Sequence, residues 1–192
     1  MPKEQKTLSS SLGHMIAAMT IVAAFAGSIL AFSYQITKAP IQAAKDNRKL
    51  EAIKEVINAE FDNNPFAERI DIGSGIELYP ARQDGKITSI AIKTYSNNAF
   101  SGRLELIVGF MLDGTINGYK VIEQKETPGL GSKIEEPKFS SQFKGLNPMS
   151  KSFKVRQDGG EIDAITSATI SSRAVIDAIS RAYNKYLNFS NI

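Results

Sequence analysis

The chain has 192 residues, of which 42% are hydrophobic and 22% are charged, a composition typical of a folded globular protein. Its net charge is only +3 and its Lys and Arg residues form no basic stripe, so we expect no nucleic-acid partner. The absence of cysteine excludes disulfides, thiolate-held iron–sulfur clusters and covalent c-type haem, and a single histidine, His14, argues against a histidine-based metal centre or catalytic triad. Any redox chemistry must therefore come from an organic cofactor.

An uncharged apolar stretch near the N-terminus predicts a membrane anchor. As a helix, residues 15–37 would be about 34 Å long at ~1.5 Å per residue, enough to cross a bilayer core of roughly 30 Å. A signal peptide cleaved near Ala24-Phe25-Ala26 is less favoured because the apolar run continues beyond that point, and a buried soluble helix is less favoured because no charge interrupts the run. We therefore expect a short leader over residues 1–14 and one transmembrane helix over residues 15–37.

The charges on either side of this stretch do not settle its orientation. A bare count would place the C-terminal part of the chain in the cytoplasm, but long domains are translocated largely regardless of charge. The positive residues are Lys3 and Lys6 before the stretch and Lys38, Lys45, Arg48 and Lys49 after it.

A stalk and a linker are expected over residues 38–75. Pro40 predicts the end of the first helix or a bend in it. Residues 41–60 then have the pattern of a second helix that docks on the domain, and a loop follows up to Gly75. The apolar face of the second helix is Leu50, Ile53, Val56 and Ile57.

The remainder, residues 76–192, is expected to form one α+β domain, an antiparallel sheet with flanking helices. Alternating or apolar runs predict strands, and the Asp-Gly pairs at 84–85 and 113–114 predict the turns before and between them. No G-x-G-x-x-G follows a strand, so a dinucleotide site of the Rossmann type is not indicated. The expected elements are strands 87–95, 104–112 and 116–124, a short helix over 137–143, a short strand over 153–155 and a turn at 158–160.

The last helix is expected to begin between Thr169 and Ser172, directly after a stretch rich in hydroxyl groups. Its apolar positions recur at helical spacing, and the start of such a helix offers unpaired N–H groups and a positive dipole end to a phosphate. The alternative is that each hydroxyl only caps the helix, which is worth roughly 1 kcal/mol. The apolar positions are Val175, Ala178, Ile179, Ala182, Tyr183 and Tyr186.

Two short motifs resemble the FMN-binding domain family. Asp163 followed by Thr166-Ser167-Ala168-Thr169 resembles its acceptor motif, Asp-x-x-Ser/Thr-Gly-Ala-Thr, with Ser167 at the glycine position. The loop over residues 126–131 resembles the Glu-Thr-Pro-Gly-Leu-Gly loop of the same family, although alone it would predict only a turn. The resemblance covers about residues 76–186 and the anchor, and it is closest to the G subunits of Rnf electron-transport complexes.

The resemblance implies a covalent cofactor. In that family a flavin transferase attaches FMN through its phosphate to the last threonine, here Thr169. The helix start and nearby hydroxyls would stabilise the phosphodiester charge, Leu130 would lie against the flavin ring, and Lys133 either balances the reduced flavin or is solvated. Asp163 either positions the transferase's metal or caps the backbone. The implied cofactor-binding residues are Glu126, Thr127, Pro128, Gly129, Leu130, Gly131, Lys133, Thr166, Ser167, Ala168, Thr169, Ser171 and Ser172.

The resemblance further implies an electron carrier without catalytic residues of its own. It would relay electrons in an Rnf-type ferredoxin:NAD oxidoreductase that couples electron flow to ion translocation, with the other Rnf subunits, the flavin transferase and membrane lipid as partners. The family places this domain on the periplasmic side of the cytoplasmic membrane, against the charge count, which implies a cytoplasmic leader over residues 1–14. The alternatives are the C subunit of a sodium-translocating NADH:quinone reductase, another extracytoplasmic flavinylated carrier, or a membrane-tethered binding domain without redox function.

Overall fold

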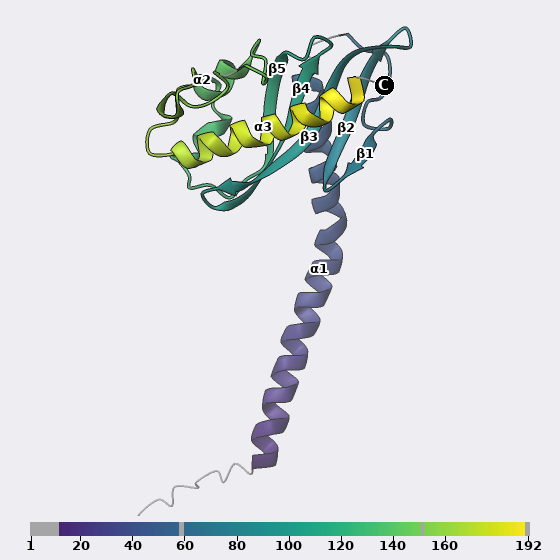
Figure 1. The fold of residues 1–192 in the computed structure, drawn as a ribbon. Coiled ribbons are helices and arrows are strands. Elements are labelled where there is room, and N and C mark those ends of the chain that lie inside the picture. The colour runs from purple at the N-terminus through teal and green to yellow at the C-terminus, as the bar shows by residue number, and fades with distance from the viewer. Residues whose placement is uncertain (1–11, 58–59, 151, 191–192) are drawn as a thin grey trace, which may run out of the picture. The chain divides into compact units, whose positions relative to one another are not determined.

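The structure is a computed structural model that describes residues 12–57, 60–150 and 152–190 (Figure 1). The chain divides into two compact units, one ending at Asp46 and the other starting at Asn47. The predicted α+β class is confirmed, because five antiparallel strands carry helices on their faces. The elements are α1 (Leu12–Val56), β1 (Ile70–Gly73), β2 (Ile76–Gln83), β3 (Lys86–Ala99), β4 (Gly102–Met111), β5 (Ile116–Glu123), α2 (Pro137–Ser140) and α3 (Thr169–Ser190), with 3₁₀ turns at Gly131–Glu135, Ser141–Phe143 and Arg156–Asp158.

Helix α1 contains the predicted membrane span. Within the described residues it is the one helix long and apolar enough to cross a membrane, with a mean hydropathy of 2.2 in its most apolar window. The expectation that Pro40 separates two helices is wrong, because Pro40 lies inside α1, which runs on to Val56 and not to Glu60. A proline removes one N–H donor, and the helical hydrogen bonds on either side of it are sufficient to continue the helix. Of the expected leader, residues 1–11 lie outside the described part.

The sheet is a meander in which every strand pairs with its neighbour in the chain. The order is β1-β2-β3-β4-β5, all antiparallel, which confirms the three predicted strands and the hairpin turn at Asp113-Gly114. The expected loop before Gly75 is partly wrong, because it contains strand β1. Its sequence, Ile-Asp-Ile-Gly, alternates apolar and polar residues, but four residues are too short a run to predict a strand, and this edge strand is mostly exposed.

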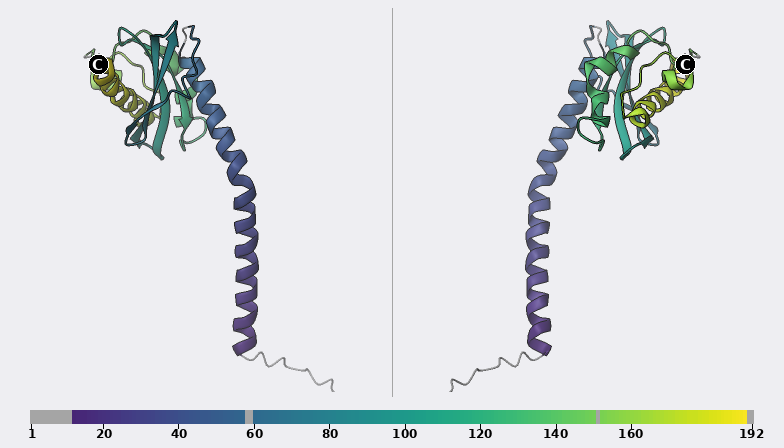
Figure 2. Two further views of the ribbon diagram at one scale, coloured as in Figure 1. Left: turned by 90° about the vertical axis from the view of Figure 1, so that its right-hand side faces the viewer. Right: turned by 90° about the vertical axis from the view of Figure 1, so that its left-hand side faces the viewer.

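Helix α3 covers one face of the sheet (Figure 2). Its predicted apolar face is buried against residues such as Leu106 and Phe110 of β4. Two side chains of β3 fix the helix along its axis, since the Thr94 hydroxyl donates to the Ala178 carbonyl at 3.0 Å and the Ser96 hydroxyl to Asp177 at 2.6 Å.

The opposite face of the sheet carries the last turns of α1, as the docking prediction required. Ile53, Val56 and Ile57 are buried there against side chains of β2, β3 and β4. The Asn117 side chain donates to the Val56 carbonyl at 2.6 Å and so caps the end of the helix. A Cβ added to Gly109 would lie 2.8 Å from the Val56 carbonyl carbon and nearer still to its oxygen. The close approach of helix and sheet therefore depends on this glycine.

The segment between α2 and α3 is mostly irregular. The predicted short helix is present as α2 and the 3₁₀ turn that follows it. The predicted strand over 153–155 is wrong, because only an isolated bridge joins Val155 to Ile162. The chain turns into 3₁₀ helix Arg156–Asp158 directly after that bridge, and Gly159 ends the turn at φ 82°, where the sequence predicted it.

A ladder of charges crosses strands β2, β3 and β4. Lys93 is a buried residue, and its ammonium group lies 3.4 Å from a Glu77 oxygen and 3.2 Å from a Glu105 oxygen. Lys49 lies 3.6 Å from Glu77, and the Tyr79 hydroxyl donates to the same carboxylate at 2.6 Å. Burial alone would raise the pKa of Glu77, but the Tyr79 hydrogen bond and the charges of Lys49 and Lys93 together lower that pKa below its ordinary value of 4.5.

We expect Glu77→Gln to destabilise the domain at neutral pH and to lose this effect in acid. A carboxyl with a lowered folded pKa stabilises the native state above its unfolded pKa, near 4.5, and the stabilisation is lost as pH falls through the folded pKa. The difference in unfolding free energy between parent and variant should therefore be constant above about pH 5 and shrink below it. Denaturant unfolding followed by circular dichroism measures it, and a difference that grows toward acid would contradict the argument.

Candidate functional site

The predicted acceptor stretch leads directly into helix α3, which begins at Thr169. The Ser172 hydroxyl holds the preceding loop, because it donates to the Ala168 carbonyl at 3.0 Å and accepts the Ile165 N–H at 3.0 Å. Within the described residues, the backbone N–H groups of residues 169–171 have no hydrogen-bond acceptor, as expected for the first turn of a helix. These donors are therefore available to an anion.

Ser167 has a left-handed backbone conformation, with φ of 63°. Only glycine adopts this conformation without steric cost, because a Cβ comes too close to the neighbouring carbonyl oxygen. Small size is thus not the whole reason for the glycine that the family has at this position. The turn itself requires a positive φ.

We expect Ser167→Gly to fold at least as well as the parent and Ser167→Val to be destabilised. Glycine removes the backbone strain of the turn, but its greater conformational freedom in the unfolded chain opposes part of this stabilisation. The free energy of unfolding should therefore rise by at most about 1 kcal/mol. The β-branched valine should cost about 1–2 kcal/mol at this φ. Denaturant unfolding of the detergent-solubilised full chain measures both, and equal stability of the two variants would rule out strain at this position.

The two predicted motifs meet in one pocket of about 320 Å³. The loop after β5 contributes one wall, and the start of α3, including the partly exposed Thr169, contributes the other. The predicted residues in its lining are Glu126, Thr127, Leu130, Gly131, Ser167, Ala168, Thr169 and Ser171.

The other predicted residues lie elsewhere. Thr166 and Lys133 line a neighbouring pocket of about 360 Å³ together with Asp163. Pro128 and Gly129 are exposed beside the Thr169 pocket and do not line it, and the Ser172 side chain is buried inside the helix packing.

Glu126 ties three segments of the pocket together. It is buried, it accepts the Ser101 N–H from the β3–β4 turn at 2.8 Å, and it accepts the Ser171 hydroxyl from the first turn of α3. A Cβ on Gly131 would lie 2.8 Å from the Ser171 hydroxyl oxygen and nearer still to a Glu126 oxygen. Gly131 therefore allows the loop to pack on this carboxylate.

The hydrogen bonds change the expected roles of two serines. The sequence argument gave Ser171 and Ser172 to a phosphate group, but the Ser171 hydroxyl donates to Glu126 and the Ser172 hydroxyl to the Ala168 carbonyl. Both side chains are buried. What remains for an anion is the set of free backbone N–H groups.

Two arginines near the helix start are paired with carboxylates. The Arg156 guanidinium lies 2.5 Å from the Asp163 carboxylate, and the Asp163 N–H donates to the Gln142 side chain at 2.8 Å. Arg173, in the first turn of α3, makes two hydrogen bonds to Asp158 of 2.7 and 2.8 Å, which lower the pKa of that carboxyl. Neither pair lines the pocket that contains Thr169.

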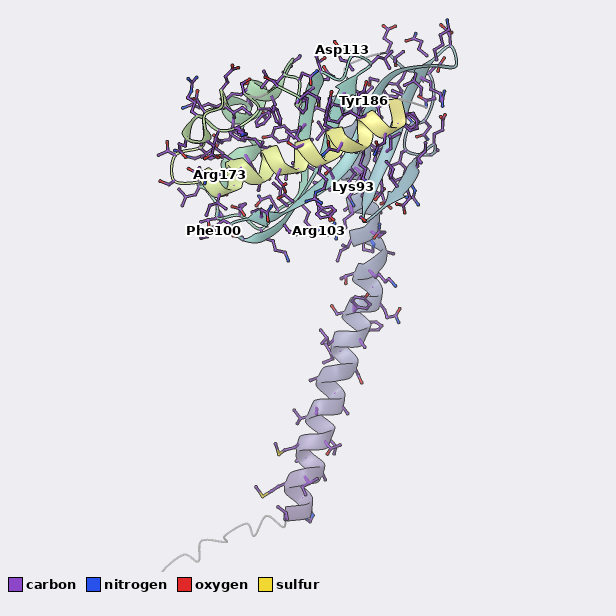
Figure 3. The ribbon with its side chains drawn as sticks, viewed as in Figure 1. Lys93, Phe100, Arg103, Asp113, Arg173 and Tyr186 are labelled. Carbon is purple, nitrogen blue, oxygen red and sulfur yellow. The ribbon has the colours of Figure 1, made fainter. Side chains whose placement is uncertain are left out.

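Two pocket residues were not predicted. Ile170 follows Thr169 in the helix, and Phe100 comes from the turn between β3 and β4. Figure 3 shows Phe100 at the same end of the domain as Arg173, where α3 begins. The sequence signal was an aromatic residue within the polar turn sequence Asn-Asn-Ala-Phe-Ser-Gly, which does not by itself indicate a site.

Residues 99–184 match the family described as the FMN-binding domain. The chain is 32% identical over 184 residues to the G subunit of the ion-translocating oxidoreductase complex of Vibrio cholerae, covering 88% of this chain and 87% of that protein. It is 34% identical over 179 residues to the G subunit of the same kind of complex in Methanosarcina acetivorans, covering 91% and 94%. The chain therefore belongs to the family of G subunits of ion-translocating oxidoreductase complexes.

A solved structure shares the fold. The crystal structure of the C subunit of the Na⁺-translocating NADH-quinone reductase from Parabacteroides distasonis has a TM-score of 0.56 at 21% identity, over 77% of this chain and 94% of that one.

Proposed function

We propose that the chain carries FMN covalently bound through its phosphate to Thr169 and relays electrons within an ion-translocating oxidoreductase complex. The observation that carries the proposal is the meeting of three features at one point: a partly exposed threonine hydroxyl, free backbone N–H groups and an apolar pocket. The family match and the relatives support the cofactor and the complex.

The residues present fit the group. A pocket of about 320 Å³ falls within the roughly 300–1,000 Å³ typical of small-molecule sites. A phosphodiester on Thr169 keeps one negative charge, and the N–H groups of residues 169–171 with the positive end of the α3 dipole would stabilise it. Leu130 and Ile170, both exposed at the pocket, offer apolar surface to a ring.

FMN supplies the capacity to accept and donate electrons, and attachment through the phosphate leaves its ring chemically free. The chain's own residues bind and position it. Ser172 and Glu126 fix the helix start and the loop, while Leu130 and Ile170 exclude water from part of the ring. No further chemistry is needed from a carrier that receives electrons from one protein of the complex and passes them to another.

The same proposal places the protein in the cytoplasmic membrane. α1 would cross the bilayer once over residues 15–37, in contact with lipid, with the flavin domain on the outer face. The other subunits of the complex would be its electron partners, and a flavin transferase would attach the cofactor.

The test is the mass of the protein expressed with a flavin transferase. An intact mass increased by one FMN moiety, together with fluorescence of the band on a denaturing gel under ultraviolet light, is expected. A protein of unmodified mass despite transferase supply would refute the covalent cofactor. Co-purifying subunits would separate this complex from a sodium-translocating NADH:quinone reductase.

The outer location has its own test. Because the chain has no cysteine, a Lys86→Cys variant carries a single thiol at the exposed first residue of β3. A membrane-impermeant thiol reagent should label it in intact spheroplasts, while the parent stays unlabelled. Labelling that requires lysed cells would place the domain in the cytoplasm.

A further inference from the structure

Exposed apolar side chains of the domain are concentrated at the Thr169 pocket. Within the described residues from Asn47 on, seven large hydrophobic side chains are exposed, and three of them line this one pocket. They are Phe100, Leu130 and Ile170, with 68%, 43% and 47% of their surface exposed. Single exposed apolar residues are ordinary, whereas three around one pocket mark a binding surface.

Phe100 differs from the other two in origin and chemistry. Leu130 belongs to one recognised motif and Ile170 directly follows the other, but Phe100 comes from the distant β3–β4 turn. It is the aromatic residue of the lining, and an aromatic face is well suited to contact a flat conjugated ring.

A specific contact holds this turn beside α3. The Ser101 N–H, next to Phe100, donates to Glu126 at 2.8 Å, and the other oxygen of the same carboxylate accepts the Ser171 hydroxyl. Glu126 thus joins the turn that carries Phe100 to the helix start that carries Thr169. An exposed phenyl group on an untied turn would have no fixed position.

We propose that Phe100 is the aromatic contact of the flavin ring tethered at Thr169, and that Glu126 is the positioning residue that keeps its turn beside α3. This inference rests on the proposed function, because the ring must first be attached. Phe100 then closes the side of the pocket that neither recognised motif supplies.

A pair of tryptophan variants tests the contact. Phe100→Trp places an indole at the ring, whereas Met149→Trp places one at a position that is equally exposed, at 67%, but does not line the pocket. An excited flavin takes one electron from an indole in contact with it and returns it in the dark, which quenches fluorescence. Attached flavin is first measured on a denaturing gel, and native fluorescence of the full chain in detergent is then normalised to it. Phe100→Trp should lose most of this signal and Met149→Trp should keep it.

Alanine and conservative variants test the positions separately. With Phe100→Ala, the fraction of ring accessible to iodide quenching should rise about 2- to 10-fold, the range for loss of one aromatic contact. Glu126→Ala should give a similar rise. Glu126→Gln should restore the parent value, because its amide oxygen can still accept the Ser101 N–H and its amide nitrogen can donate to Ser171.

The possible results distinguish this inference from the proposed function on which it rests. Absence of flavin from the parent protein on the denaturing gel would refute both the proposed function and the Phe100 contact. Equal native fluorescence of the two tryptophan variants at equal loading would overturn the Phe100 contact and leave the covalent flavin standing. Equal iodide quenching of Glu126→Ala and Glu126→Gln would overturn the positioning role.

Discussion

Thr169→Ala should abolish covalent flavin attachment completely, whereas Thr166→Ala should leave it intact. The two threonines lie three residues apart in the same motif, yet Thr169 lines the pocket with the apolar walls and Thr166 lines the neighbouring one. The Thr169 hydroxyl makes no hydrogen bond within the described residues, so its removal should not disturb the fold. The loss is expected to be total because no other free hydroxyl begins the helix.

The measurement is band fluorescence on a denaturing gel after co-expression with a flavin transferase, with intact mass as the second readout. Thr169→Ser keeps a hydroxyl at the same place and should retain attachment. A dark Thr166→Ala band beside a bright Thr169→Ala band would move the attachment site to the neighbouring pocket.

Gly109→Ala should destabilise the domain by about 2–3 kcal/mol, the upper part of the range for an overpacked core. The added methyl group would collide with the backbone carbonyl of Val56, which cannot rotate away as a side chain can. The end of α1 would have to move off the sheet, and the Asn117 hydrogen bond to the same carbonyl would be lost with it.

The sheet supplies a matched control. Gly118 lies directly opposite Gly109 in the β4–β5 pairing, and a Cβ there would meet nothing within 4 Å. Gly118→Ala should therefore be neutral or stabilise by up to about 1 kcal/mol. For a chain of this size the midpoint of thermal unfolding should fall by roughly 4–12 °C for Gly109→Ala and change little for the control. Equal midpoints would mean that helix and sheet are not held as closely as described.

Much of the fold could be predicted because its elements bury one regular face. The 3.6-residue period of α3 and the Asp-Gly turns between strands specify local structure without knowledge of the tertiary fold. Pro40 and strand β1 could not be predicted in this way. A proline is compatible with either a kink or an end, and β1 exists because β2 is beside it to pair with.

The candidate site, like the fold, could be predicted from the sequence only in part. The two motifs could be recognised from the residues, and the structure brings most of them into one pocket. The roles of Ser171 and Ser172 were missed although a signal existed, since they precede the buried Val175, Ala178 and Ile179 at helical spacing and therefore face inward. Phe100 had no such signal, because its position depends on a hydrogen bond between Ser101 and the distant Glu126.

The open side of the Thr169 pocket has a consequence for affinity. A ring on a short tether experiences an effective local concentration in the millimolar range, so contacts too weak to retain free FMN are sufficient to keep it docked. A covalently loaded pocket therefore has no need to enclose its cofactor. The side chains of Phe100, Leu130 and Ile170 can stay half in solvent, which would leave part of the proposed Thr169-linked ring within reach of a redox partner.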